Sequence, residues 1–158
     1  MIRGVLRRLV ALGLCGLLAA CAVPMTYPAG LPAAEPHFLM DWFVARDGIR
    51  MTVRSWRPKG PARAIVVALH GFNDYSNFFA TPGAWLADRG VTSYAYDQRG
   101  FGDGIGIGLW AGTDAYVRDL ADFTALVRRT HPGVPVYVLG DSMGGAVALV
   151  AGAGPAET

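Results

Sequence analysis

Three short strand-like runs alternate along the chain with segments of helical pattern. The first run, at residues 64–69, is continuously apolar and rich in β-branched residues. Such a run is typical of a strand buried on both faces of a parallel sheet. The expected strands are 64–69, 91–96 and 135–139, and the expected helices are 76–88, 113–130 and 143–151. This alternation predicts an α/β fold with a mostly parallel sheet and helices on both of its faces.

Two further strand-like runs come before this alternating region. Residues 38–45 and 49–56 flank the turn pair Asp47-Gly48, which predicts a β-hairpin. The later segment 113–130 has the clearest helical pattern, because its apolar residues fall on one stripe.

The N-terminus has the organisation of a secretory signal peptide. Three arginines in the first eight residues precede an uninterrupted stretch of apolar or small residues at 9–20. This stretch is too short to span a bilayer core, which takes about 20 residues, but it suits the apolar region of a signal peptide. Leu18-Ala19-Ala20-Cys21 ends the stretch and resembles a bacterial lipobox. The resemblance implies cleavage after residue 20 and acylation of the Cys21 sulfur.

Acylation of Cys21 predicts a lipid-anchored protein of the bacterial cell envelope, on the periplasmic side of the outer membrane. Two or more acyl chains hold a protein stably at a membrane. Cys15 lies within the leader and is discarded with it, so the remaining chain has a single cysteine and no intramolecular disulfide. The alternative is an ordinary signal peptide that is cleaved nearby, with Cys21 incidental.

Residues 21–36 contain a proline at every fourth position from Pro24 to Pro36. This composition predicts a semi-rigid tether. The expected organisation is therefore a leader at 1–20, a proline-rich tether at 21–36 and a partial α/β domain at 37–158.

Composition excludes several classes of protein. An apolar share of 53% rules out a disordered chain. Removal of the three leader arginines leaves 11 basic residues against 12 acidic ones, and no basic patch recommends a nucleic-acid partner. The glycine-heavy stretch 100–108 does not match the dinucleotide pattern G-x-G-x-x-G, and no zinc or phosphate motif is present. We expect no metal and no cofactor.

The segment Gly140-Asp141-Ser142-Met143-Gly144 matches G-x-S-x-G. A predicted buried strand precedes it and an apolar helical segment follows it, as a nucleophile elbow requires. Gly140 and Gly144 are expected because a Cβ at either position would collide across the turn, and Gly145 eases packing of the helix on the strand. Ser142 then projects at a helix N-terminus, where negative charge is favoured.

A second segment, His70-Gly71-Phe72, leaves the end of the strand at 64–69. In a parallel sheet this position lies beside the elbow. The backbone N–H groups of Phe72 and Met143 are therefore predicted to form an oxyanion hole. Gly71 lets the backbone approach the substrate, and His70 is expected to support the loop.

These segments, with Tyr96-Asp97-Gln98-Arg99-Gly100-Phe101-Gly102 between them, resemble the α/β-hydrolase superfamily. Within it the chain is similar to the bacterial monoacylglycerol lipase and lysophospholipase group. The resemblance covers about residues 38–153. It implies hydrolysis of lipid-like acyl esters with Ser142 as nucleophile.

A serine hydroxyl needs a base to take its proton. In this superfamily the triad follows the order Ser, Asp or Glu, His. After Ser142 the chain has no histidine and no aspartate, and its only acid is Glu157. We therefore expect the N-terminal portion of a longer enzyme that lacks its C-terminal strands and lid, is inactive by itself, and leaves the elbow strand as an apolar edge.

Other functions stay open. A non-catalytic lipoprotein that uses the fold as a binding module is one alternative, and an acyltransferase or peptidase of the same superfamily is another. Asp97, Arg99 and His70 are expected to be structural, and His131 is expected to be a solvated residue at a helix end.

Overall fold

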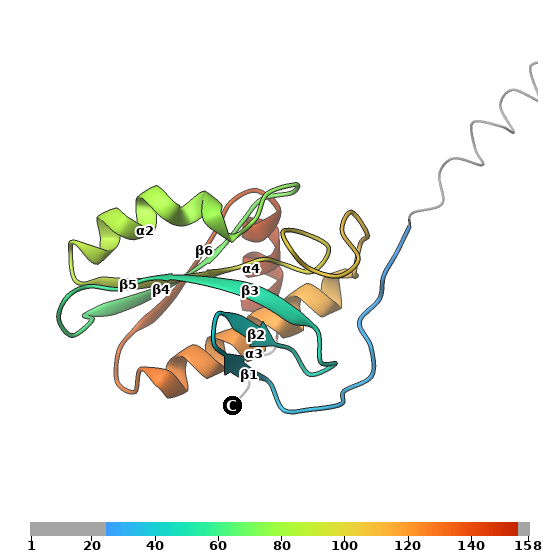
Figure 1. Ribbon diagram of the computed structural model, residues 1–158, viewed down its shortest axis with the longest axis horizontal. Coiled ribbons are helices and arrows are strands. Elements are labelled where there is room, and N and C mark those ends of the chain that lie inside the picture. The colour runs from blue at the N-terminus through green and yellow to red at the C-terminus, as the bar shows by residue number, and fades with distance from the viewer. Residues whose placement is uncertain (1–24, 155–158) are drawn as a thin grey trace, which may run out of the picture.

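The computed structural model describes residues 25–154, which fold around one six-stranded sheet (Figure 1). The strands are β1 (His37–Leu39), β2 (Trp42–Val44), β3 (Arg50–Trp56), β4 (Ala64–Leu69), β5 (Val91–Tyr96) and β6 (Val136–Gly140). The helices are η1 (Ser76–Phe79), α2 (Ala80–Ala87), α3 (Thr113–Thr130) and α4 (Met143–Ala153). The strand order is β1-β2-β3-β5-β4-β6.

The predicted α/β fold is confirmed. Strands β5, β4 and β6 are parallel neighbours, as the alternation of strands and helices requires. Every residue of β5 is buried, in line with a central strand covered on both faces. The sheet as a whole is mixed, because β1, β2, β3 and β5 pair antiparallel in that order.

The predicted hairpin is present but has an additional strand. Val44 pairs with Arg50 across the Asp47-Gly48 turn, where Gly48 has φ +80°. The expected first strand is divided at Met40, whose φ of +51° reverses the chain so that β1 pairs with β2. The N-terminal part of the domain is therefore a three-stranded meander.

Helices cover both faces of the sheet (Figure 1). On one face, α2 packs against β3 and β5, where Phe79 and Ala95 are buried together. On the other face, α3 and α4 pack against each other and bury Phe123 and Val147 in the larger part of the core. None of the helices in the described part is both long and apolar enough to cross a bilayer.

Strand β6, which leads to Ser142, lies at one end of the sheet and pairs with β4 alone among the described strands. Its side chains are partly exposed, with 59% of Tyr137 and 46% of Leu139 accessible. Leu149 of α4 is 76% exposed. This end of the described fold therefore presents apolar side chains to solvent.

Residues 25–36, part of the segment expected to be a tether, lie against the domain (Figure 1). The N–H groups of Ala33 and Ala34 both donate to the carbonyl of Arg46, at 2.7 and 3.0 Å. The N–H of Gly30 donates to the Asp47 carboxylate at 2.9 Å. The predicted leader at 1–20 and the predicted acylation site Cys21 lie outside the described residues.

Candidate active site

Ser142 occupies the tight turn between β6 and α4. Its backbone has φ +46° and ψ −110°, a sparsely populated conformation for a residue with a side chain. The N–H of Asp141 donates to the carbonyl of Leu69 at 3.0 Å, which ties the turn to the end of β4. The N–H of Gly144 donates to the carbonyl of Asp141 at 2.7 Å and closes the turn.

Three glycines allow the backbone to pack this closely. A Cβ on Gly140 would lie 2.3 Å from the carbonyl carbon of Gly144, and one on Gly144 would lie 2.4 Å from the carbonyl oxygen of Leu69. A Cβ on Gly145 would lie 3.2 Å from the carbonyl oxygen of Gly140. The nearest obstacles at Gly140 and Gly144 are backbone atoms, which cannot rotate away as a side chain can. A larger residue at either position would therefore force the turn to change shape.

The loop after β4 lies directly against this turn. A Cβ on Gly71 would be 2.9 Å from Oδ2 of Asp141 and 3.4 Å from Cβ of Ser142. Neither the N–H of Phe72 nor that of Met143 has a hydrogen-bond acceptor within residues 25–154. Two backbone N–H groups near Ser142 are thus unpaired: that of Met143, the next residue in the chain, and that of Phe72, in the loop after the neighbouring strand β4. An oxyanion hole requires such free donors.

His70 holds the loop in place through both ring nitrogens. The Nδ1–H donates to the carbonyl of Gly71 at 2.7 Å, and Nε2 accepts the backbone N–H of Gln98 at 2.9 Å. One nitrogen donates and the other accepts, so the ring is the neutral tautomer. The Gln98 side-chain amide also donates to the carbonyl of His70, at 2.8 Å.

Burial of the His70 side chain agrees with this assignment. The residue has no exposed surface. Burial lowers the pKa of its imidazole below the ordinary value, and this effect outweighs the hydrogen bond to Gly71 and the charges of Asp97 and Asp74, which raise it. His70 therefore stabilises the loop structurally, because both its nitrogens are already engaged. Gln98, its partner, was not singled out from the sequence.

Comparison with known proteins assigns the chain that carries this site to a family. Residues 60–157 match the family model described as serine aminopeptidase, S33. The chain belongs to the S33 serine aminopeptidase family. It is 28% identical to the human monoglyceride lipase over 80% of its own length and 42% of that protein. It is 29% identical to the monoacylglycerol lipase of Mycolicibacterium smegmatis over 70% of its own length and 40% of that protein.

Solved structures agree with the fold of this S33 family chain. An esterase from Exiguobacterium antarcticum superposes with a TM-score of 0.54 and 26% identity, over 76% of this chain and 42% of that one. A lipase in an open form superposes with a TM-score of 0.60 over 73% of this chain. The chain thus spans about two fifths of the length of the human monoglyceride lipase and of the Exiguobacterium antarcticum esterase.

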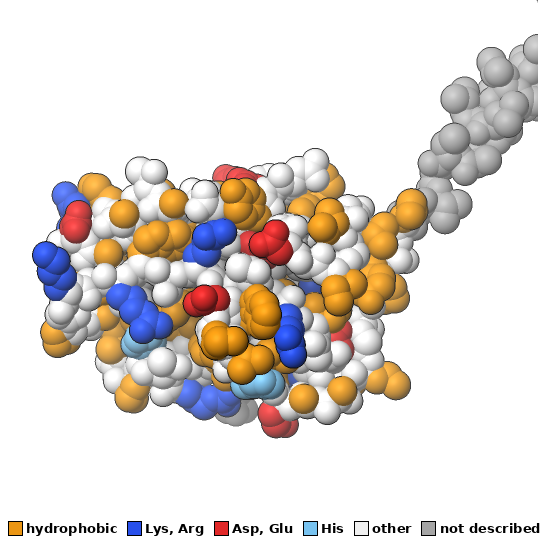
Figure 2. All heavy atoms as spheres, in the orientation of Figure 1, with side chains coloured by type: hydrophobic (Ala, Val, Ile, Leu, Met, Phe, Trp, Pro, Cys, Tyr) orange, Lys and Arg blue, Asp and Glu red, His pale blue; other side chains and the backbone are white. Residues whose placement is uncertain are grey.

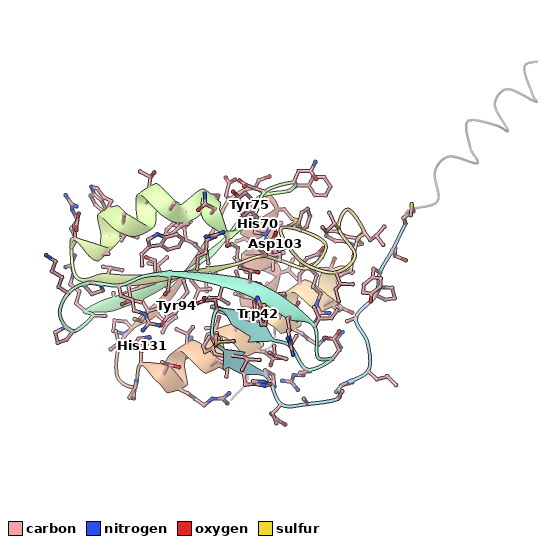
Figure 3. The ribbon with its side chains drawn as sticks, viewed as in Figure 1. Trp42, His70, Tyr75, Tyr94, Asp103 and His131 are labelled. Atoms are coloured by element: carbon pink, nitrogen blue, oxygen red, sulfur yellow. The ribbon has the colours of Figure 1, made fainter. Side chains whose placement is uncertain are left out.

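In this S33 family chain, the loop after β5 is hydrogen-bonded to the segment that begins η1. The Asp97 carboxylate accepts the backbone N–H of Ser76 at 2.8 Å and that of Asp103 at 3.2 Å. Figure 3 shows the labels of His70, Tyr75 and Asp103 close together in the upper middle of the view. Asp97 therefore joins the start of η1 to the loop that follows β5.

Arg99 makes a buried ion-pair network with two carboxylates. Its guanidinium donates two hydrogen bonds to Asp47, at 2.6 and 3.0 Å, and two to Asp119. Burial raises the pKa of the Asp47 carboxyl, but the hydrogen bonds and charge of Arg99 outweigh it, and the pKa lies below its ordinary value. Arg99 thereby connects the β2–β3 turn, α3 and the loop after β5.

The other two histidines of the chain lie away from Ser142. Nε2 of His131 is 2.8 Å from the Tyr94 hydroxyl, and Figure 3 shows this pair well separated from His70. His131 is thus hydrogen-bonded to Tyr94 as well as partly solvated. Nδ1 of His37 is 2.9 Å from the carbonyl of Glu35. No His, Cys, Asp or Glu cluster within residues 25–154 has the arrangement of a metal site.

Proposed function

We propose that this chain carries the nucleophile of a serine hydrolase that cleaves carboxylic esters of lipid-like acyl groups. The observation that carries the proposal is the position of Ser142, in a strained turn that contacts Gly71 while the N–H groups of Phe72 and Met143 stay unpaired. Membership of the S33 family supports a hydrolase. The names of the relatives, monoglyceride lipase and monoacylglycerol lipase, support a lipid ester as substrate.

In the proposed reaction, the Ser142 hydroxyl oxygen attacks the ester carbonyl while a base removes its proton. The tetrahedral oxyanion accepts hydrogen bonds from Phe72 and Met143, and each such donor contributes about 3 kcal/mol to lowering the barrier. The intermediate expels the alcohol, which receives the proton, and leaves an acyl-enzyme. Water then hydrolyses the acyl-enzyme with the same base.

The base and the acid that orients it would come from residues beyond these 158. His70 is committed to the loop, and His37 and His131 make their hydrogen bonds elsewhere. We therefore expect the 158-residue chain alone to hydrolyse nitrophenyl esters no faster than the uncatalysed reaction in buffer. Enzyme-like turnover by this chain would contradict the assignment of the base.

The test uses the complete polypeptide in which this sequence lies. A fluorophosphonate probe, which labels activated serines, is expected to label it, and Ser142→Ala is expected to abolish labelling. Ser55→Ala is the matched control, because Ser55 is exposed on β3 and should leave labelling unchanged. Labelling that survives Ser142→Ala would exclude Ser142 as the nucleophile.

A peptidase is the second candidate, because the matched family model is described as a serine aminopeptidase. The two candidates differ in the bond that is cleaved. We expect the complete polypeptide to hydrolyse monoacylglycerols faster than aminoacyl nitroanilides, and the reverse order would favour the peptidase. A polypeptide that cleaves neither and resists the probe would favour the non-catalytic lipoprotein.

We further propose that the protein is secreted and anchored by acylated Cys21 in the bacterial cell envelope. The supporting features are the leader arginines, the apolar stretch 9–20 and the lipobox-like residues before Cys21. Metabolic labelling with a palmitate analogue should tag the protein, and Cys21→Ser should remove the tag. A tag that persists in Cys21→Ser would place the acyl group elsewhere.

A further inference from the structure

The loop after β5 presents two isoleucines to solvent. Ile105 and Ile107 are 63% and 67% exposed, and glycine occupies every second position from 104 to 108. The loop is fixed by its own main-chain hydrogen bonds, such as the one that the N–H of Gly108 donates to the carbonyl of Gly100 at 2.9 Å. The two apolar side chains are therefore held outward by an ordered loop.

The beginning of the described chain lies beside this loop (Figure 1). The N–H of Tyr27 donates to the carbonyl of Trp110 at 3.0 Å, and the N–H of Trp110 donates to the carbonyl of Met25 at 3.3 Å. A Cβ on Gly106 would lie 3.1 Å from Cγ of Tyr27, so the Tyr27 ring packs on the loop. Main-chain and side-chain contacts thus join the N-terminal segment to the loop.

The two segments together form one exposed apolar surface. Met25 is 73% exposed, Tyr27 41% and Trp110 38%. These three side chains, with Ile105 and Ile107, make up the apolar patch. Figure 2 shows hydrophobic side chains gathered where the coloured part of the molecule meets the grey atoms. Contiguous apolar surfaces of this kind typically mark a contact with a membrane or with another molecule.

The two segments that form the apolar patch carry almost no charge. Residues 25–34 contain no charged side chain, and the loop 100–112 contains one, Asp103. Tyrosine and tryptophan, both present in the patch, are enriched where proteins meet the boundary between lipid headgroups and hydrocarbon. Because neither segment has a lysine or an arginine, attraction to anionic headgroups is not what this surface offers. Its chemistry fits the interface of an uncharged or zwitterionic bilayer.

The proposed lipid anchor is close to this patch along the chain. Cys21 precedes Met25 by four residues. A fully extended chain covers at most ~3.6 Å per residue, so the two residues are separated by no more than about 14 Å. A bilayer that holds an acylated Cys21 therefore lies within reach of the patch.

We propose that the apolar patch is a second membrane contact, which inserts Ile105, Ile107 and Trp110 into the bilayer interface and fixes the orientation of the domain. The proposal rests on the proposed acylation of Cys21, which brings the bilayer to this end of the molecule. An acyl anchor alone leaves the domain free to rotate about its attachment. Because a tethered contact has a high effective concentration, a patch that binds weakly by itself is sufficient.

This orientation has a consequence for the candidate active site. The loop after β5 and the turn after β6 both follow the carboxyl ends of parallel strands. Contact through the patch would therefore turn the edge of the sheet that carries Ser142 toward the lipid.

Vesicle binding by the complete polypeptide tests the patch without the anchor. The polypeptide is expressed from residue 22, so that neither the leader nor an acyl chain contributes, and it is mixed with vesicles of phosphatidylcholine alone. We expect co-sedimentation that persists at high salt, because salt screens charge interactions and the patch has none to offer. Binding that requires anionic lipid and disappears at high salt would overturn the proposal.

Vesicles with brominated acyl chains identify the residue that enters the bilayer, because bromine quenches nearby tryptophan fluorescence. We expect quenching on binding, and Trp110→Phe should remove most of it. Trp85→Phe is the matched control, because Trp85 is 55% exposed on α2, and it should leave the quenching unchanged. Quenching that disappears with Trp85→Phe instead would place the contact on α2 and exclude the patch.

Isoleucine variants measure how much the loop contributes. Ile105→Asn and Ile107→Asn should each weaken binding to phosphatidylcholine vesicles by roughly fivefold or more, because each removes apolar area that the bilayer would bury. Met40→Asn is the matched control, because Met40 is 86% exposed in the β1–β2 turn, and it should bind as the parent does. Ile105→Phe should strengthen binding, a gain that a misfolded variant could not produce. Equal binding by Ile105→Asn and Met40→Asn would contradict the proposal.

A second copy of the chain is the other occupant that these variants can reveal. Dimerisation that Ile105→Asn abolishes, together with no vesicle binding by the parent polypeptide, would replace the membrane contact by a subunit interface.

The outcome is separable from that of the proposed function. Loss of fluorophosphonate labelling or of the acyl tag, together with vesicle binding that depends on Ile105, would reject the hydrolase or the anchor and support the patch. A tagged Cys21 and a labelled Ser142, together with no vesicle binding from residue 22 onward, would reject the patch and support the proposed function.

Discussion

The carbonyl oxygen of Leu69 lies 2.4 Å from the position that a Cβ on Gly144 would occupy. Gly144→Ala is therefore expected to push α4 away from β4 and lower the free energy of unfolding by about 2–3 kcal/mol. Urea denaturation measures the change. Gly152→Ala is the matched control in the same helix, where a Cβ meets no atom within 4 Å, and it should raise stability by up to ~1 kcal/mol. Equal effects at the two positions would contradict the close packing.

Ser142 is expected to reduce the stability of the fold. A positive φ of +46° costs a residue with a Cβ about 1–3 kcal/mol, whereas glycine adopts it without strain. Ser142→Gly should raise the free energy of unfolding by about 1 kcal/mol, after the larger backbone entropy of glycine in the unfolded chain is deducted. Ser142→Ala keeps the Cβ and should change stability little. A stabilisation shared by both variants would place its origin outside the backbone.

The Arg99 network is expected to depend on guanidinium geometry. Arg99→Lys keeps the charge but cannot make paired hydrogen bonds to Asp47 and Asp119 together, and it should lower the free energy of unfolding by about 2–3 kcal/mol. Arg128→Lys, on the exposed side of α3, should stay within about 0.5 kcal/mol of the parent chain. Thermal or urea unfolding of the two variants, with the parent chain, checks the contrast.

Stability is expected to fall as the pH falls from 7 to 5. Burial lowers the pKa of His70 and of His131 in the folded protein, while the unfolded chain titrates at about 6.5. Below that pH the unfolded state binds more protons, so the free energy of unfolding declines until the folded-state pKa is reached. Asp47, whose folded pKa is lowered, adds a separate loss at more acidic pH, below about 4.

Urea midpoints at several pH values measure this dependence. His131→Gln removes one of the two contributions and should make the decline shallower. A free energy of unfolding that rises between pH 7 and 5 would contradict the neutral, buried state of His70.

The sheet and helices were predictable because the local order of apolar and polar residues indicates which side chains are buried. β4, β5 and α3 have the boundaries expected from the sequence, since β-branched runs and an apolar stripe are read over a few residues. The elbow was predictable for a similar reason, because glycines at 140 and 144 are required by a turn that is itself local.

The unpredicted contacts join residues far apart in the sequence. Gln98 binds His70 across 28 positions, and Arg99 binds Asp47 across 52. Nothing in the local pattern around Asp47 distinguishes a turn residue from an ion-pair partner. The docking of residues 25–34 was missed for the same reason, because prolines restrict the backbone but do not reveal which surface it packs on.

That docking affects where a shortened version of the protein should begin. A polypeptide that starts at residue 37, the expected domain boundary, would keep every strand and helix described above. It would lose Met25 and the Tyr27 hydrogen bond to Trp110, and it would leave the Arg46 carbonyl without its two donors. Measurements on such a version would describe a domain without the segment that packs on its surface, and a start before residue 25 avoids this.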